Sequence, residues 1–245
     1  TQQTGALTAR LDPKGHTDFV LSFRQVAPAL VWYRRGVSGW SRYVIEKEFL
    51  PVEAGGAAFD IDADGDLDLV FGGDAQSGQL WWWENPAPQF DPNVSWTRRA
   101  IKAGGAKQHH DQLFADIQGS GQPQLIFWNQ QAKTLYLAPI PTQPRTDRQW
   151  PLEVIYAGQA GEGVDGAAAY AEGLDAVDVN GDNRLELLAG NFLFRYGNGR
   201  FTPTRIGSIG GRIKGGRFIQ ASRSAQVVIA PGDGSGPLRF YQHRD

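Results

Sequence analysis

Cysteine and methionine are both missing from this chain of 245 residues. The lack of cysteine excludes a disulfide framework, a thiolate metal site and a cysteine nucleophile. The lack of methionine extends to the first position, which is Thr1. We therefore expect either that a leader has been removed or that the chain is a fragment, and we expect the protein to be secreted, extracellular or periplasmic.

An excess of one charge and a long apolar run are also missing. The 24 Lys and Arg residues nearly balance the 26 Asp and Glu residues, and no apolar stretch approaches the roughly 18 residues of a membrane helix. Neither a nucleic-acid partner nor membrane insertion is expected. The chain also lacks a G-x-S-x-G motif and a phosphate-binding glycine loop, so serine hydrolase and nucleotide chemistry have no support.

The residues that are abundant favour strands and turns. The sequence holds 31 Gly and 14 Pro, and 11% of its residues are aromatic, including 8 Trp. Long helical periodicity is absent, and Gly, Pro, Asn and Asp fall between short apolar runs. This composition predicts an all-β protein.

An acidic or polar loop followed by an apolar run occurs five times. The clearest copy is the loop from Asp60 to Asp68, which precedes the run 69–71. Other copies precede the runs at 19–21, 125–127, 187–188 and 227–229, and the intervals between copies range from 40 to 62 residues. Repeats of about 40 to 50 residues with four strands each are typical of β-propellers.

Each repeat is expected to form one four-stranded antiparallel blade. In the second repeat we expect strands at 56–61, 67–71, 80–83 and 96–101, with the run Trp81-Trp82-Trp83 packed between blades. The predicted fold is a single propeller domain with five visible repeats, either complete or part of a larger, for example seven-bladed, propeller. The blades are expected at about 1–50, 51–103, 104–157, 158–208 and 209–245.

The fifth repeat has no evident outermost strand. Sheets usually avoid an unpaired edge. We therefore expect this edge to meet further blades of a larger propeller, a protein partner or a second copy of the chain.

The loop of the second repeat has the spacing of a calcium site. Oxygen ligands at positions 1, 3, 5 and 9, with a glycine for the sharp turn, allow one short loop to surround a hard cation. Five carboxylates in nine residues would repel one another without a cation, although a solvated acidic turn is the alternative. The expected Ca²⁺ ligands, with position 7 contributing its carbonyl or its side chain, are Asp60, Asp62, Asp64, Asp66 and Asp68.

A second structural calcium site is expected in the loop of the fourth repeat. This loop keeps the same ligand spacing but lacks the glycine after position 5. The loops of the other three repeats carry neutral or basic residues at ligand positions, so we expect them to fold without metal. The expected ligands in the fourth repeat are Asp178, Asn180, Asp182 and Glu186.

These repeats resemble the FG-GAP, or VCBS, family, whose D-x-D-x-D-G-x-x-D loops bind calcium between the first two strands of a propeller blade. The resemblance is most specific at 60–73 and covers essentially the whole chain, although family members commonly have seven blades. More narrowly, the segments His109-His110-Asp111-Gln112, Glu172-Gly173-Leu174 and 80–85 are similar to the propeller of aldos-2-ulose dehydratase-like proteins. The resemblance implies a secreted propeller that binds carbohydrate or acts on it.

Polar residues before the inner strands are the candidates for catalysis. Equivalent positions of successive blades lie around one ring, so the segments 107–111, 170–172 and 212–214 are expected to converge at the mouth of a central channel. Such groups suit acid and base chemistry on a substrate rich in hydroxyls. The candidates are His109, His110, Asp111, Tyr170, Glu172 and Lys214.

Each of these candidates has a structural alternative. His110 or Tyr170 could remove a proton beside a carbonyl, with Glu172, Lys214 or a cation stabilising the enolate. His110 could equally be a hydrogen-bonded structural residue, and Glu172 could form an ion pair with Lys214. His109 and His110 are adjacent and point in opposite directions in a strand, so a two-histidine metal site is not expected.

Three functions follow from the sequence. The first is a carbohydrate lyase or dehydratase that uses the channel residues. The second is a calcium-stabilised module that binds carbohydrate, another small polar ligand or a protein, through aromatic residues at blade edges. The third is a structural propeller segment of a larger assembly. The sequence leaves open whether the protein is an enzyme.

Overall fold

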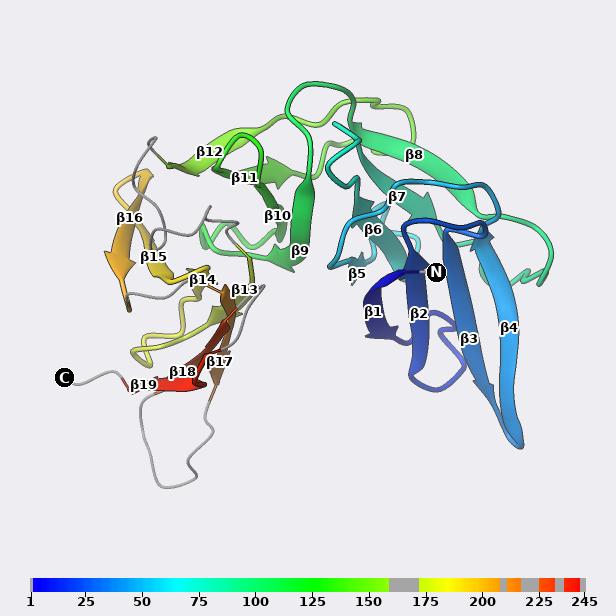
Figure 1. Cartoon of the computed structure of the whole chain (residues 1–245), viewed down its shortest axis with the longest axis horizontal. Helices are drawn as coiled ribbons and strands as arrows, with labels where there is room; N and C mark the ends of the chain where they lie inside the picture. The colour runs from blue at the N-terminus through cyan, green and yellow to red at the C-terminus, as the bar shows by residue number, and fades with distance from the viewer. Residues whose placement is uncertain (1, 159–171, 208–210, 217–224, 232–235, 243–245) are drawn as a thin grey trace. The chain divides into compact units, whose positions relative to one another are not determined.

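The computed structural model describes residues 2–158, 172–207, 211–216, 225–231 and 236–242. Within these ranges every regular element is a β-strand, which confirms the all-β prediction. The same ranges contain no helix that is long and apolar enough to cross a membrane. The strands form successive antiparallel meanders, which are the blades of a β-propeller (Figure 1).

The first two sheets each contain four strands in sequence order. Their strand orders are β1-β2-β3-β4 and β5-β6-β7-β8. The strands expected in the second repeat are all present, with slightly different ends. The bounds are β1 (Gln3–Ala9), β2 (Asp18–Phe23), β3 (Leu30–Gly36), β4 (Gly39–Glu46), β5 (Ala57–Phe59), β6 (Asp68–Gly72), β7 (Leu80–Glu84) and β8 (Thr97–Lys102).

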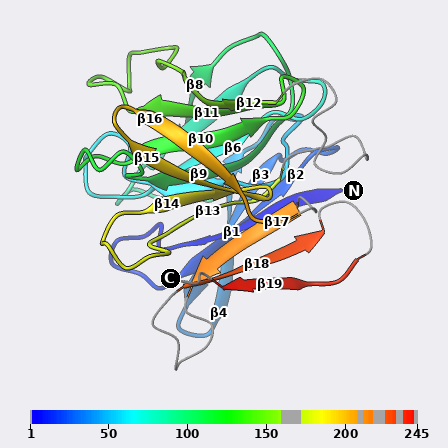
Figure 2. The ribbon, with the colours of Figure 1, turned by 90° about the vertical axis from the view of Figure 1, so that its left-hand side faces the viewer.

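The third and fourth sheets also have four strands, and the fifth has three within the described residues. Their orders are β12-β11-β10-β9, β13-β14-β15-β16 and β17-β18-β19, the last of which is seen in Figure 2. The bounds are β9 (His109–Ala115), β10 (Gln124–Asn129), β11 (Thr134–Pro139), β12 (Glu153–Ala157), β13 (Leu174–Val177), β14 (Glu186–Ala189), β15 (Phe192–Gly197), β16 (Arg200–Arg205), β17 (Gly211–Gly216), β18 (Gln226–Pro231) and β19 (Arg239–Gln242).

The chain divides into two compact units. The first unit comprises Thr1–Phe114 and Pro139–Pro151, and the second comprises Ala115–Ala138 and Leu152–Asp245. The division into five blades within one domain stays a prediction, as does the covering of the last blade's edge.

The core of the first unit is aromatic and lies between its sheets. Strand β2 alternates between buried and half-buried residues, whereas every residue of β6 is buried, so both faces of β6 are covered. Trp81, Trp82 and Trp83 are at most 5% exposed, which confirms that they pack in the core. Trp83 shares one hydrophobic cluster with Trp32 and residues of the first sheet.

The core of the second unit includes a close approach between its last two sheets. Val179, Leu188, Ile213 and Ile229 belong to one buried cluster. Gly215 of β17 allows this packing, because a Cβ atom at this position would lie 2.3 Å from Val177 Cγ1. The backbone N–H of Gly215 also donates a hydrogen bond to Asp175 Oδ2 at 2.8 Å.

Candidate functional site

The acidic loop between β5 and β6 is closed by the carboxylates at its two ends. Asp60 accepts hydrogen bonds from the backbone N–H groups of Asp64 and Gly65, each at 3.1 Å. Asp68, the first residue of β6, accepts one from Ile61 N at 3.0 Å. Gly65 has a φ of 97°, a left-handed conformation that glycine adopts without strain. The sequence therefore folds this segment into a compact turn with its carboxylates directed inward.

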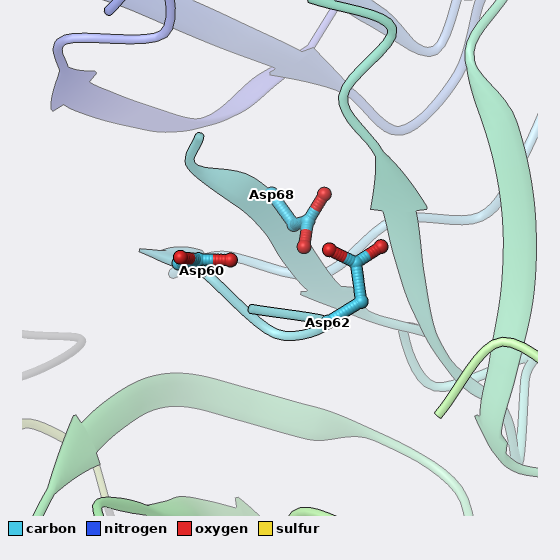
Figure 3. A group of neighbouring side chains, drawn as sticks. All are labelled: Asp60, Asp62 and Asp68. Carbon is cyan, nitrogen blue, oxygen red and sulfur yellow. The ribbon is translucent and has the colours of Figure 1, made fainter. Parts of the chain in front are cut away.

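Three carboxylates of this acidic loop face a common space (Figure 3). Oxygen atoms of Asp60, Asp62 and Asp68 lie within 4.8 Å of one another. The Asp62 side chain is only 2% exposed; its Oδ1 atom has no hydrogen-bond donor, and its Oδ2 atom has only an ion-pair contact with Arg145. Asp66 Oδ1 is also buried without a hydrogen-bond donor. Buried carboxylate oxygens in this state are costly unless a cation neutralises them, so these residues fit a divalent ion with oxygen ligands.

Burial and mutual repulsion alter the proton affinity of these groups. Burial raises the pKa of Asp68 to about 8, against hydrogen bonds from the backbone of Asn85 and Ile61 that lower it. Burial, together with Asp64, Asp62 and Asp60, raises the pKa of Asp66 to about 7. Burial, together with Asp64, Glu84 and Asp60, also raises the pKa of Asp62, against Arg145, which lowers it. The loop therefore concentrates more negative charge than the protein framework compensates.

Arg145 supplies part of the missing positive charge. Its Nη2 atom lies 2.8 Å from Asp62 Oδ2 and 2.8 Å from Asp64 Oδ2, and its Nε atom lies 2.8 Å from Glu84 Oε1. Arg145 belongs to the segment between β11 and β12, far along the chain from the loop. No pattern in the sequence pointed to it, because the contact depends on how that segment crosses the second blade.

The loop of the third repeat has the same hydrogen-bonded turn with a neutral residue at position 9. Asp116 accepts hydrogen bonds from the N–H groups of Ser120 and Gly121, as Asp60 does at the equivalent positions. Gln124 replaces the carboxylate of position 9, and its Nε2 atom donates to Asp116 Oδ1, to Ser120 Oγ and to the carbonyl of Gln122. The amide nitrogen thus bridges loop positions 1, 5 and 7. This geometry supports the expectation that the third loop folds without metal.

The loop of the fourth repeat has the same hydrogen-bonded frame. Asp178 accepts bonds from the N–H groups of Gly181, Asp182 and Asn183, and Glu186 accepts one from Val179 N at 2.8 Å. Among the described residues, however, only Asp60, Asp62 and Asp68 gather as a metal-binding group. A second calcium site at Asp178, Asn180, Asp182 and Glu186 stays a prediction.

His110 and Asp111 form a pair at the start of β9. His110 Nδ1 lies 2.8 Å from Asp111 Oδ2, and His110 is 6% exposed. Asp111 has a left-handed backbone with a φ of 45°, which is unusual for a residue other than glycine. Its N–H group donates to the carbonyl of Ala54 at 3.2 Å. Strained residues of this kind are concentrated at functional sites, which makes the pair the best catalytic candidate in the first unit.

Two glycines allow β9 to approach the second sheet. A Cβ atom at Gly55 would lie 2.6 Å from Asp111 Cα, and one at Gly72 would lie 2.4 Å from the carbonyl oxygen of His109. His109 is fully buried, and burial, with a smaller contribution from Lys102, lowers its pKa to about 3. A neutral, enclosed imidazole suits a structural role better than proton transfer at neutral pH.

The remaining catalytic candidates lie in the second unit. Tyr170 is outside the described residues, and Glu172 is buried. The Lys214 side chain is 70% exposed, and its Nζ atom lies 3.6 Å from Asp175 Oδ1. His109, His110 and Asp111 belong to the other unit, so the convergence of all six candidates at a channel mouth stays a prediction.

Comparisons with known proteins show the fold alone. No family model matches the chain, and no curated protein matches it. The FG-GAP resemblance is therefore carried by the repeat motifs themselves, without support from a family match.

Solved structures match most of this chain. It is similar to the exotype rhamnogalacturonan lyase YesX, with a TM-score of 0.54, 13% identity and coverage of 97% of this chain and 47% of that one. A Bacillus licheniformis rhamnogalacturonan lyase, PL11, gives a TM-score of 0.55 and 13% identity over 97% of this chain and 48% of that one. The V. cholerae biofilm matrix protein Bap1 gives 0.52 and 15%, over 93% and 34%. The chain thus spans about half or less of the length of these proteins. At such low sequence identity, the structural similarity establishes the β-propeller fold alone.

Proposed function

We propose that this chain is a calcium-stabilised β-propeller of the FG-GAP type that binds carbohydrate. The observation that carries the calcium assignment is the Asp62 carboxylate, which is buried among other acidic groups with no donor to Oδ1 and only the half-exposed Arg145 guanidinium beside Oδ2. The resemblance of the repeats to FG-GAP loops supports the same assignment. When bound, the ion supplies positive charge that neutralises the loop and links its two ends.

The hydrogen-bonded turn of the acidic loop identifies the oxygen atoms that would bind calcium. Asp60, Asp62, Asp64 and Asp68 would provide carboxylate oxygens. The third loop, in which Gln124 Nε2 meets the carbonyl at position 7, supports the carbonyl of Asp66 as a further ligand. Alternating positions on one short turn can direct all of these oxygens to one centre.

Calcium binding predicts a stability gain that depends on these carboxylates. An ion present at about 100 times its Kd should stabilise the folded state by about 2.7 kcal/mol, because it binds that state alone. Thermal melts in calcium and in chelator measure the gain. Asp62→Asn should remove most of it, whereas Asp147→Asn, which changes an exposed aspartate, should retain it. Equal melting temperatures of the unchanged protein in calcium and in chelator would contradict the assignment.

Carbohydrate is the ligand class that the comparisons favour. Two of the structurally similar proteins are rhamnogalacturonan lyases, and the narrower sequence resemblance is to carbohydrate-active propellers. Export, expected from the sequence, would give the protein access to such polymers. Binding to a panel of soluble polysaccharides, including rhamnogalacturonan, tests this part of the proposal, and the absence of binding to every member would argue against it.

Lyase or dehydratase activity is a second candidate function, favoured by the His110–Asp111 pair. With the proton on Nδ1, His110 donates to Asp111, which holds the imidazole in one orientation and leaves Nε2 as the acceptor. The ring can then accept a proton from a carbon beside a sugar carbonyl or carboxylate. As that C–H bond breaks, a carbon–carbon double bond forms and the neighbouring C–O bond breaks, with a second proton delivered to the leaving oxygen.

The elimination reaction has a direct assay. The new double bond absorbs in the ultraviolet, so turnover of acidic polysaccharides can be followed without a label. His110→Gln should lower the rate by about 100-fold or more, as removal of a general base does. His16→Gln replaces an exposed histidine and should leave the rate unchanged. Unaltered turnover in His110→Gln would exclude the pair, whereas binding without turnover would favour the lectin-like function.

A further inference from the structure

We infer that Arg145 competes with calcium for Asp62 and Asp64, so that the protein carries its own replaceable counter-ion for the acidic loop. The inference rests on the calcium site proposed above. It assigns a role to a residue outside the loop, on the segment that joins β11 to β12.

A single nitrogen of Arg145 bridges two expected metal ligands. Its Nη2 atom lies 2.8 Å from Asp62 Oδ2 and 2.8 Å from Asp64 Oδ2. These oxygens occupy loop positions 3 and 5. Calcium binds such oxygens at 2.3 to 2.6 Å, so an ion and the guanidinium would face the same lone pairs at distances where two positive charges repel each other.

The third loop provides an internal comparison. There the Nε2 atom of Gln124 also bridges loop positions, contacting Ser120 Oγ at 3.0 Å and Asp116 Oδ1 at 3.5 Å. In each of the two loops, therefore, a nitrogen donor from the protein contacts oxygens that a cation would use. In the third loop this donor belongs to the loop and is buried, whereas Arg145 comes from outside and its side chain is 45% exposed. The guanidinium has access to solvent if an ion displaces it.

The other contacts of Arg145 allow this exchange to stay local. Its Nε atom lies 2.8 Å from Glu84 Oε1, and its carbonyl accepts a hydrogen bond from Arg99 Nη1 at 2.6 Å. Farther along the segment, the N–H of the buried Trp150 donates to the carbonyl of Ile101 at 2.9 Å. None of these contacts uses Asp62 or Asp64. Calcium binding should therefore free the Nη groups of Arg145 and loosen residues 141–148, while the backbone contact of Trp150 keeps the end of the segment attached.

Calorimetric titration with calcium tests the competition. Arg145→Gln removes the competing charge and should tighten calcium binding by about tenfold, while lowering the melting temperature in chelator. Arg148→Gln is the matched control, because Arg148 is exposed on the same segment and makes no side-chain hydrogen bond or ion pair among the described residues. Arg148→Gln should leave both the calcium affinity and the melting temperature in chelator unchanged.

Hydrogen exchange separates competition from a general effect of charge. In the unchanged protein, calcium should slow exchange in the loop 60–68 and accelerate it in the segment 141–148. A purely long-range effect would leave the segment's exchange as it was, which would overturn the inference. An equal or weaker calcium affinity in Arg145→Gln would also overturn it while leaving the calcium site intact. Failure of both proteins to bind calcium would refute the site and the inference together.

Discussion

At the scale of single residues, the surroundings of a buried polar group determine which charge is favoured there. Asp62 and His109 are both enclosed, but with opposite electrostatic consequences. Asp62 keeps a buried oxygen, Oδ1, without a donor and pairs its other oxygen with Arg145, so its surroundings favour positive charge. His109 lies near Lys102, and its lowered pKa keeps the imidazole neutral. The adjacent His110 instead contacts a carboxylate, with its Nδ1 atom 2.8 Å from Asp111 Oδ2.

His109 should make the protein sensitive to acid. Its pKa falls from 6.5 to about 3 on folding, so the unfolded chain binds a proton at this site below pH 6.5 and the folded chain does not until near pH 3. Stability is therefore lost as the pH falls through this window, by up to about 1.4 kcal/mol per unit.

The variant His109→Gln lacks this contribution. The stability difference between the unchanged protein and the variant should shrink by roughly 2 to 3 kcal/mol between pH 6.5 and pH 4.5. Urea unfolding at a series of pH values measures it. His16→Gln, at an exposed site, should follow the unchanged protein throughout. A constant difference for His109→Gln would mean that His109 is not held neutral.

At the scale of elements, the loops before the second strand of the second, third and fourth blades share one hydrogen-bonded turn and differ in how their charge is balanced. In the second, third and fourth repeats, the aspartate at position 1 accepts hydrogen bonds from backbone N–H groups at positions 5 and 6. The residue at position 9 is buried in all three: Asp68, Gln124 and Glu186. The three loops thus share one backbone turn, and we expect the side chains at positions 3, 5 and 9 to determine whether a cation binds.

Replacing Gln124 in the third loop tests whether the side chain at position 9 determines the need for a cation. Gln124→Glu removes the donor that bridges three loop oxygens and places a carboxylate near Asp116. The loss should cost about 1 to 3 kcal/mol in chelator, and calcium should recover part of it. Denaturant unfolding in both conditions measures the effect. Gln122→Glu adds the same charge at an exposed position and should cost little. An unchanged stability of Gln124→Glu would show that the amide is not the substitute for a cation.

At the scale of the whole molecule, the acidic loop belongs to one of two compact units. It lies in the first unit with Arg145 and the His110–Asp111 pair, whereas the fourth-repeat loop lies in the second. A metal bound at the second-repeat loop should therefore stabilise the two units unequally.

Site-resolved hydrogen exchange can detect this inequality. At calcium concentrations about 100 times the Kd, the protection factors of β5 and β6 should rise by up to about 100-fold, because opening of these strands releases the ion. Those of β14 and β15 should rise less. The asymmetry should disappear in Asp62→Asn. An equal rise throughout the described strands would mean that the two units open together or that a second ion is bound.

The sequence determined those features of the protein that depend on neighbours along the chain. Alternating apolar residues and punctuating glycines predicted the blades, and the spacing of aspartates from Asp60 to Asp68 predicted the acidic turn, since both depend on residues within about ten positions. Only the tertiary structure brought Arg145 to Asp62 and Asp64, and only it set Asp111 against Gly55 and His109 against Gly72. These contacts join segments tens of residues apart, and their geometry depends on how whole sheets pack, which local patterns do not encode.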